Sequence, residues 1–169
     1  MKPFLVLILF LGASCAHAGS PELQDVQEGA RPAELLSQSD AESILGEPCR
    51  LADSLSQSGA GVHTYRCSFA AHSAQAERTG NLYFLYERYD KPALAQKKYS
   101  ATRSANEENG IIVLEDVGDE AYFHSDNENF CFIMVRKGNT VINMKVSKIT
   151  PTMSLDDFHR VARKITAAL

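Results

Sequence analysis

The segment NFCFIMVRKGNTVINMKV, residues 129–146, constrains the fold more than any other part of this chain. Its Gly138-Asn139 pair separates two apolar runs, a pattern typical of a β-hairpin with a two-residue turn of the primed type. Counting outward from the turn gives three opposed pairs: Val135 with Ile142, Ile133 with Met144, and Cys131 with Val146. These six residues share one face, because side chains alternate along a strand. We therefore expect this apolar face to lie in the core.

The other face of the same hairpin carries Phe130, Phe132 and Met134 beside Val141, Asn143 and Lys145. Three large apolar side chains on an open sheet would form an unusual exposed patch. Either a helix or a partner must therefore cover them. We favour the helix, because the helices of this chain suffice to cover both faces of one sheet.

Periodicity and turn residues predict five further strands and three helices. The strands are expected at 49–54, 62–69, 81–88, 111–114 and 121–125, and the helices at 40–45, from Asp90 toward Gly110, and after Ser154. Strands that follow one another along the chain favour antiparallel pairing. The fold class is therefore α+β, with a mainly antiparallel sheet covered by helices as an α-β-α sandwich.

Local residues predict where the helices begin and end. Ser39 with Glu42 forms a capping box for the first helix, and Gly46 ends it in a left-handed conformation. The last helix carries an apolar stripe that we expect to dock on the sheet. Its members are Leu155, Phe158, Val161, Ala162, Ile165 and Leu169.

The first 18 residues are typical of a signal peptide for export. Lys2 precedes a short apolar run, and Ala16 and Ala18 form the small-residue pattern that signal peptidase cleaves. We favour cleavage after Ala18, followed by a disordered leader or tether at 19–32 and a single domain at 33–169. The alternative is lipidation at Cys15, which would make the protein a membrane-anchored lipoprotein instead of a periplasmic or secreted one.

The charge of the chain excludes one class of partner. The sequence has 17 basic and 21 acidic residues, and one of the basic residues, Lys2, lies in the predicted signal peptide. The remainder carries a net charge of −5. Such a surface repels phosphate backbones, so nucleic acid is not expected as a partner, and contact with a membrane is expected only through a lipid anchor.

The cysteines predict one disulfide. Cys49 and Cys67 lie equally far from Ser58, inside a turn-rich stretch between two predicted strands. A hairpin centred there would place the two cysteines face to face, within disulfide range. The alternative is two separate buried thiols. Cys131 lies on the apolar face of the second hairpin, so we expect it to be a buried core residue and not a nucleophile.

Several of these stretches together resemble a known family. DAESILGEPC, YRCSF, VGDEAYF and VRKGNTVINMKV are similar to segments of a domain of unknown function found in bacterial, especially actinobacterial, lipoproteins. The resemblance spans about Leu35 to Leu169. It implies the PsbP-like α-β-α sandwich fold and a location in the cell envelope. It carries no catalytic residues.

The motifs of common enzymes are missing from the sequence, so no cofactor, metal or catalytic residue is predicted. Asp119 and Glu120 form the most prominent acid pair, but neighbours in a strand point to opposite faces and would not converge on one substrate. Tyr83 and Tyr86, with Lys97 and Lys98, could form a partner surface. We favour ordinary packing for these four residues.

These observations favour a non-enzymatic exported domain. We expect it to bind an unidentified protein, cell-wall fragment or small molecule through a sheet edge or a cleft beside a helix. The alternative is a periplasmic inhibitor or immunity protein directed against an exported toxin or a wall hydrolase. The loops at 57–61 and 126–129 are the candidates for inhibitory contacts.

Overall fold

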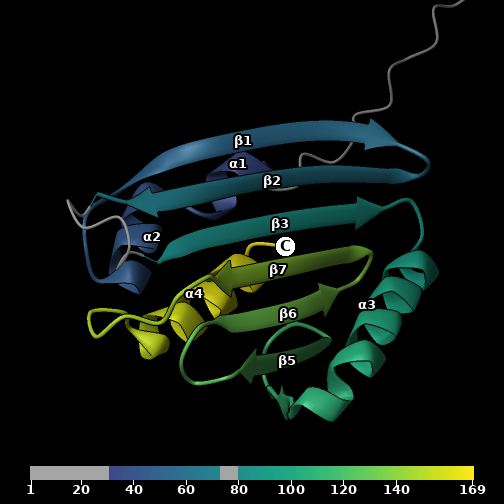
Figure 1. Ribbon diagram of the computed structural model, residues 1–169. Helices are drawn as coiled ribbons and strands as arrows, with labels where there is room; N and C mark the ends of the chain where they lie inside the picture. The colour runs from purple at the N-terminus through teal and green to yellow at the C-terminus, as the bar shows by residue number, and fades with distance from the viewer. Residues whose placement is uncertain (1–30, 73–79) are drawn as a thin grey trace, which may run out of the picture.

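A computed structural model describes residues 31–72 and 80–169 of the chain (Figure 1). The predicted signal peptide, Cys15 and most of the predicted leader lie outside these residues. The helices are α1 (Pro32–Leu35), α2 (Gln38–Leu45), α3 (Pro92–Asn106), η2 (Glu107–Asn109) and α4 (Leu155–Ala167). The strands are β1 (Cys49–Gly59), β2 (Val62–Ala71), β3 (Asn81–Tyr89), β4 (Ile112–Val113), β5 (Glu120–Ser125), β6 (Cys131–Lys137) and β7 (Thr140–Val146).

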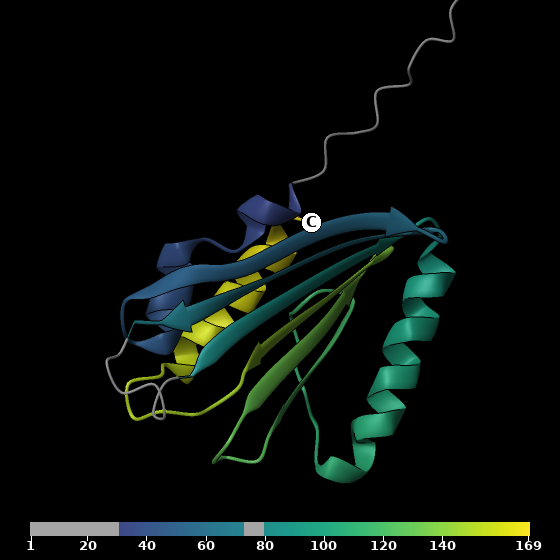
Figure 2. The same cartoon turned by 45° about the horizontal axis from the view of Figure 1, so that its top comes forward.

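The described strands form one sheet in the order β1-β2-β3-β7-β6-β5-β4, and every neighbouring pair is antiparallel. Figure 2 shows α2 and α4 on one side of this sheet and α3 on the other. The predicted α+β class with helices on both faces of an antiparallel sheet is confirmed.

The register of the β6–β7 hairpin agrees with the sequence. Val135 lies opposite Ile142, Ile133 opposite Met144, and Cys131 opposite Val146. All six are buried in the main core, which lies between the sheet and the α2–α4 layer. Gly138 has a φ of +56°, which the two-residue turn requires and glycine adopts without strain.

The same turn also holds the chain that leads into α3. The backbone N–H of Tyr89 donates to the carbonyl of Asn139 at 2.9 Å, and the Asn139 side-chain amide donates to the carbonyl of Tyr89 at 2.6 Å. Tyr89 is the last residue of β3, and α3 begins three residues later at Pro92. The β6–β7 turn therefore fixes the point from which α3 departs.

The terminal helix docks on the sheet as predicted, with a narrower stripe. Phe158, Val161, Ala162 and Ile165 are buried in the main core. Leu155 is 45% exposed and Leu169 is 36% exposed, so the two ends of the predicted stripe lie outside the interface. Leu155 is the first residue of α4, and Leu169 follows two residues after its last.

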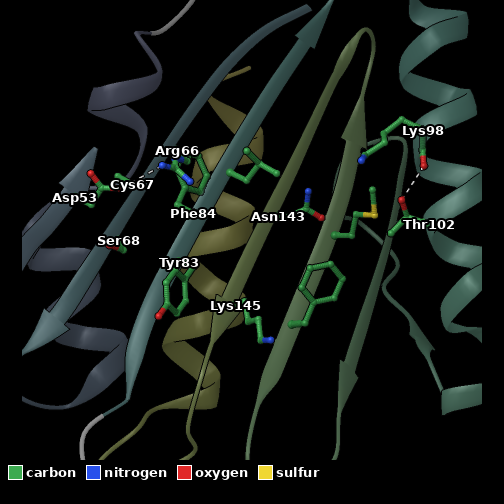
Figure 3. A pocket seen from close by; sticks show the side chains of 13 residues that line it. Asp53, Arg66, Cys67, Ser68, Tyr83, Phe84, Lys98, Thr102, Asn143 and Lys145 are labelled. Atoms are coloured by element: carbon green, nitrogen blue, oxygen red, sulfur yellow. Dashed lines mark hydrogen bonds and ion pairs between the residues drawn. The ribbon is translucent and has the colours of Figure 1, made fainter. Parts of the chain in front are cut away.

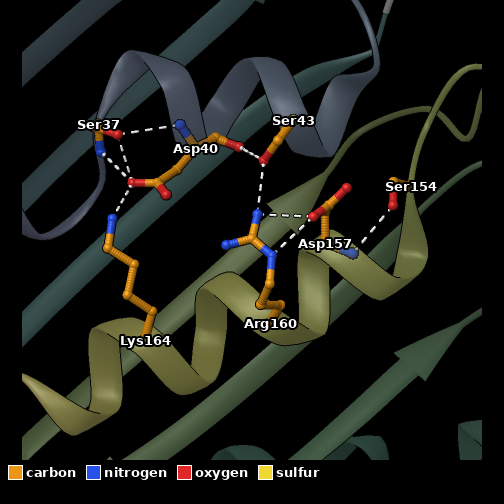
Figure 4. Close-up of polar contacts among 7 residues, drawn as sticks. All are labelled: Ser37, Asp40, Ser43, Ser154, Asp157, Arg160 and Lys164. Atoms are coloured by element: carbon orange, nitrogen blue, oxygen red, sulfur yellow. Dashed lines mark hydrogen bonds and ion pairs between the residues drawn. The ribbon is translucent and has the colours of Figure 1, made fainter.

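A polar seam joins α2 to α4 (Figure 4). The Asp40 side chain accepts from the Ser37 backbone N–H at 3.0 Å, and Ser37 Oγ accepts from the Asp40 N–H at 3.1 Å. The Lys164 ammonium of α4 donates to the same Asp40 carboxylate at 2.6 Å. The capping box is thus built by Ser37 and Asp40, not by Ser39 and Glu42 as predicted. It caps the helix and joins the two helices at once.

The other end of α2 agrees with the sequence. Gly46 has a φ of +71° and its N–H donates to the carbonyl of Glu42. A side chain at this position would collide with the backbone carbonyl of Thr152, whose hydroxyl donates to the carbonyl of Leu45 at 3.1 Å. Glycine is therefore needed both for the left-handed conformation and for the close approach of the segment before α4.

The first hairpin corrects the predicted disulfide. Cys49 lies opposite Ala71, and Cys67 lies opposite Ser54, five residues along β1. At about 3.3 Å per strand residue this places the two cysteines about 17 Å apart along the strand, far beyond disulfide reach. Cys49, Cys67 and Cys131 are all free and buried.

The reason for this error is the position of the turn. Ala60 and Gly61 have φ values of +51° and +76°, so they form a two-residue turn of the primed type, with Gly59 opposite Val62. Residues 56–58, which were expected to belong to the turn, continue β1 as a paired strand. The centre of the hairpin therefore lies further along the chain than Ser58.

The predicted buried strand at 111–114 is also wrong in part. Only Ile112 and Val113 form a strand, at the edge of the sheet, and they are 59% and 57% exposed. The preceding 3-10 turn ends at Gly110, which adopts the left-handed conformation. Ile112 and Val113 thus pair with β5 on one side only, while Ile111 packs against the small core under α3 and Leu114 against the main core.

The free thiols give a first prediction. Alkylation of the unfolded protein without reductant, followed by peptide mass spectrometry, should label Cys49, Cys67 and Cys131 as completely as in a sample that is reduced first. In the folded protein the same reagent should react slowly, because the thiols are buried and thiolate is the reactive form. A peptide pair linked through Cys49 and Cys67 would contradict the register of the first hairpin.

The α2–α4 seam gives a second prediction. Burial alone would raise the pKa of Asp40, but the hydrogen bonds from Lys164 and Ser37 bring it below its ordinary value of 3.8. The carboxylate therefore stabilises the fold fully above about pH 4, and this stabilisation is lost as the pH falls through the lower pKa of the folded state. In urea titrations Asp40→Asn should reduce the free energy of unfolding by about 1–2 kcal/mol at pH 7.

The matched control is Glu115→Gln, which removes one acidic charge from an exposed loop residue. It should change the free energy of unfolding by less than about 0.5 kcal/mol. The difference between wild type and Asp40→Asn should shrink when both are measured near pH 3. A difference that is the same at both pH values would contradict the ion pair with Lys164.

Candidate functional site

The helix layer on the α3 side covers only part of the sheet. Ala95 and Tyr99 of α3 pack on Tyr122, Met134 and Val141, which form a second, small core. α3 contacts β7 and β6, together with the end of β3 (Figure 1). The choice between a helix and a partner is thus resolved in part. α3 buries Met134 and Val141, while no helix of the described residues covers the face of β1 to β3 beside it (Figure 2).

The uncovered face and α3 together enclose a cleft of about 460 Å³. Figure 3 shows Tyr83, Asn143 and Lys145 rising from the strands while Lys98 and Thr102 lie on α3. The lining residues are Asp53, Arg66, Cys67, Ser68, Tyr83, Phe84, Leu85, Lys98, Thr102, Phe132, Met134, Asn143 and Lys145. This cleft is our candidate functional site.

The floor of the cleft is set by the strand register. One cross-strand row places Tyr83 opposite Lys145, and Lys145 opposite Phe132. The next row places Leu85 opposite Asn143, and Asn143 opposite Met134. Each polar residue of β7 is therefore flanked by apolar residues on both sides. The floor is mostly apolar, with two polar side chains in its middle.

The charges around this floor are mainly positive. Arg66 of β2, Lys98 of α3 and Lys145 of β7 line the cleft, and Asp53 is the one acidic residue among its lining residues. Asp53 lies 3.7 Å from the Arg66 guanidinium, so these two charges offset each other. Lys98 and Lys145 leave the cleft with a local charge of about +2, on a chain whose net charge is −4.

Two neutral side chains in the cleft retain free hydrogen-bonding capacity. Asn143 Oδ1 is buried and has no hydrogen-bond partner among the described residues. The Tyr83 hydroxyl accepts from the Asn81 amide at 3.4 Å, so its own O–H remains available as a donor. Tyr83 is 44% exposed although β3 is an interior strand of the sheet.

A second hollow of about 630 Å³ adjoins the cleft and shares Phe132 and Lys145 with it. It leads past Phe130 and His124 toward the loop after β5. The Lys145 ammonium lies 5.2 Å from the centre of the Phe130 ring, a cation–π contact. Lys145 therefore stands at the junction of two hollows on the same face of the sheet.

The residues predicted as a partner surface separate in the structure. Tyr83 and Lys98 both line the cleft. Tyr86 is buried in the main core on the opposite face of the sheet, and Lys97 is exposed on α3 away from the cleft. Ordinary packing is thus confirmed for Tyr86.

Arg66, Asn143 and Lys145 line the cleft but were not predicted as members of a site. Asn143 and Lys145 had been placed on the correct face of the hairpin, but that face was expected to be covered. One sequence pattern involves two of them. Asn143 and Lys145 alternate with core residues along β7, and their cross-strand neighbours Met134 and Phe132 are apolar. This pattern fits an apolar face that is open to a ligand, but it fits a face covered by a helix equally well.

The two loops that were predicted as candidates for inhibitory contacts are held by strand pairing or by hydrogen bonds of their own. Residues 57–59 belong to β1. Asp126 accepts hydrogen bonds from the backbone N–H groups of Glu128, Asn129 and Phe130. These bonds hold the pKa of the Asp126 carboxyl well below its usual range. The acid of the loop after β5 is therefore already engaged by the backbone of its own turn.

Asp119 and Glu120 were predicted to point to opposite faces of the sheet, and this prediction is wrong. Both carboxylates bind Arg136, each at 2.7 Å, and Asp119 also accepts from the Gly138 N–H at 2.8 Å. The two acids do converge, because Asp119 precedes the strand and does not follow its alternation. They converge on an arginine beside the β6–β7 turn, so they support that turn.

The buried thiols are poor nucleophiles. Burial raises the pKa of Cys131 to about 12, and burial with the nearby acids Glu42 and Glu47 raises the pKa of Cys49 to about 11. Both are therefore thiols at neutral pH. The prediction that Cys131 is a buried core residue is confirmed.

Comparisons with known proteins give no family. The sequence matches no protein-family model, and no curated protein matches it either. The resemblance to the lipoprotein domain therefore stays a prediction. Within residues 31–72 and 80–169, no helix is long and apolar enough to cross a membrane.

Proposed function

We propose that this protein is a non-enzymatic, exported domain that binds a small molecule in the cleft between α3 and the sheet. The observation that carries the proposal is an apolar floor beside α3 that neither helix layer covers. Pockets of about 300–1,000 Å³, mostly apolar and with a few oriented polar groups, are typical of small-molecule sites. The cleft fits this description in both size and lining.

The chemistry of the lining favours binding over catalysis. Acid–base catalysis needs a group that is free to exchange a proton in the site. Among the lining residues the one carboxylate, Asp53, is paired with Arg66, and the remaining charged groups are lysines on flexible stems. Asn143 and Tyr83 instead suit the role of orienting a ligand by hydrogen bonds.

The alternative, an inhibitor or immunity protein, is supported by β1. This edge strand is 11 residues long, and every residue after Cys49 is exposed. A long exposed edge presents backbone N–H and C=O groups to which a partner strand can add. The register shift between Leu51 and Asp53 interrupts that edge, which weakens it as a docking strand. We therefore favour the cleft.

The cleft gives a third prediction. The uncharged apolar dye N-phenyl-1-naphthylamine should bind the wild-type protein saturably, with increased fluorescence, because it leaves water for the apolar floor. Leu85→Trp should weaken this binding at least about tenfold, since the larger ring fills the floor beside Asn143. Thr102→Trp, which fills the cleft from the α3 side, should do the same.

The matched control is Leu94→Trp, the same substitution on an exposed part of α3 outside the cleft. Circular dichroism and thermal unfolding establish that each variant is folded. The control should bind the dye as the wild type does. Absence of saturable binding to the folded wild type, or equal loss in Leu94→Trp, would contradict a ligand site in the cleft.

A further inference from the structure

The charges of the cleft identify the chemical class of its ligand. We infer that the cleft binds a single-chain amphiphile with an anionic head, a carboxylate on an apolar chain. This inference rests on the proposed function, because it names what the cleft would hold. Its basis is the arrangement of two lysines around an apolar floor on an otherwise acidic protein.

The two lysines are available to a ligand. Neither the Lys98 nor the Lys145 ammonium has a carboxylate within ion-pair distance among the residues that the structure describes. The one acid of the lining, Asp53, is held by Arg66 instead. A negatively charged group on the ligand would therefore supply the charge that these two lysines lack in the cleft.

The position of the lysines matches an amphiphile better than a small polar anion. Lys98 lies on the helix side of the cleft and Lys145 on its floor (Figure 3). The apolar part of the floor is formed by Leu85 and Phe132, beside Met134, which α3 buries. Lysine stems pack along apolar surface while the ammonium stays near water. A carboxylate that pairs with either ammonium group would therefore leave its chain on the apolar floor.

A polar anion without a chain would gain little here. Exposed single charges attract one another weakly in water, and salt screens them further. The apolar floor supplies the binding free energy in proportion to the area that the chain covers. The lysines then select the head group, so that among amphiphiles with the same chain the one with a negative head binds most tightly.

The experiment displaces the bound dye with three ligands of one chain length: dodecanoate, dodecanol and dodecylamine. All three are used below the concentrations at which they form micelles. Dodecanoate should displace the dye from the wild type at about tenfold lower concentration than dodecanol, and dodecylamine should be the weakest. The advantage of dodecanoate over dodecanol should shrink as salt is raised.

Three variants assign the effect to residues. Lys98→Gln and Lys145→Gln should each reduce the advantage of dodecanoate by about threefold, and the double variant should bind dodecanoate and dodecanol alike. Lys97→Gln, which removes the same charge from the neighbouring residue of α3 outside the cleft, should keep the full advantage. None of the four should change the affinity for dodecanol.

The outcomes separate the inference from the proposed function. If the dye binds but dodecanoate is no better than dodecanol, or if Lys97→Gln has the same effect as Lys98→Gln, the inference fails while the ligand site stands. If the dye does not bind and the protein is monomeric, both fail. If light scattering shows a dimer that excludes the dye, a second copy covers the cleft, which also overturns both.

Discussion

The register of β6 against β7 is the constraint on which the rest of the structure depends. The turn at Gly138 sets it, since only a residue that tolerates a positive φ can stand there. Because side chains alternate along each strand, this register sends Ile133 and Met144 to the main core and Met134 and Asn143 to the other face. A slip of one residue would exchange the two faces.

The same turn decides how much of the second face is covered. Asn139 binds Tyr89 through its carbonyl and its side chain, and so fixes the start of α3 beside the turn. From there α3 runs over β7 and β6 and packs Tyr99 on Met134. None of the helices in residues 31–72 and 80–169 covers this face of β1 to β3, and the cleft lies at the boundary with the part that α3 covers. The candidate site is thus a consequence of where one helix departs.

Much of the fold could be predicted because its determinants are local. Gly138 and Gly46 mark positions where the backbone needs a left-handed conformation, and both predictions were confirmed. The pairing of Cys49 with Cys67 was wrong because several serines resemble a turn, whereas the turn was formed by Ala60 and Gly61. The cleft could not be predicted, because it depends on which strands α3 covers. That is a tertiary property, which the hydrophobic pattern of β7 leaves open.

The most direct test of this account compares two methionines on opposite faces of the sheet. Met134 lines the cleft, whereas Met144 belongs to the main core. In methyl NMR spectra of protein labelled at methionine, saturating dodecanoate should shift the Met134 resonance and leave that of Met144 in place. A ligand that shifts Met144 and not Met134, or that shifts both equally, would contradict a sheet whose register separates a closed core from an open binding face.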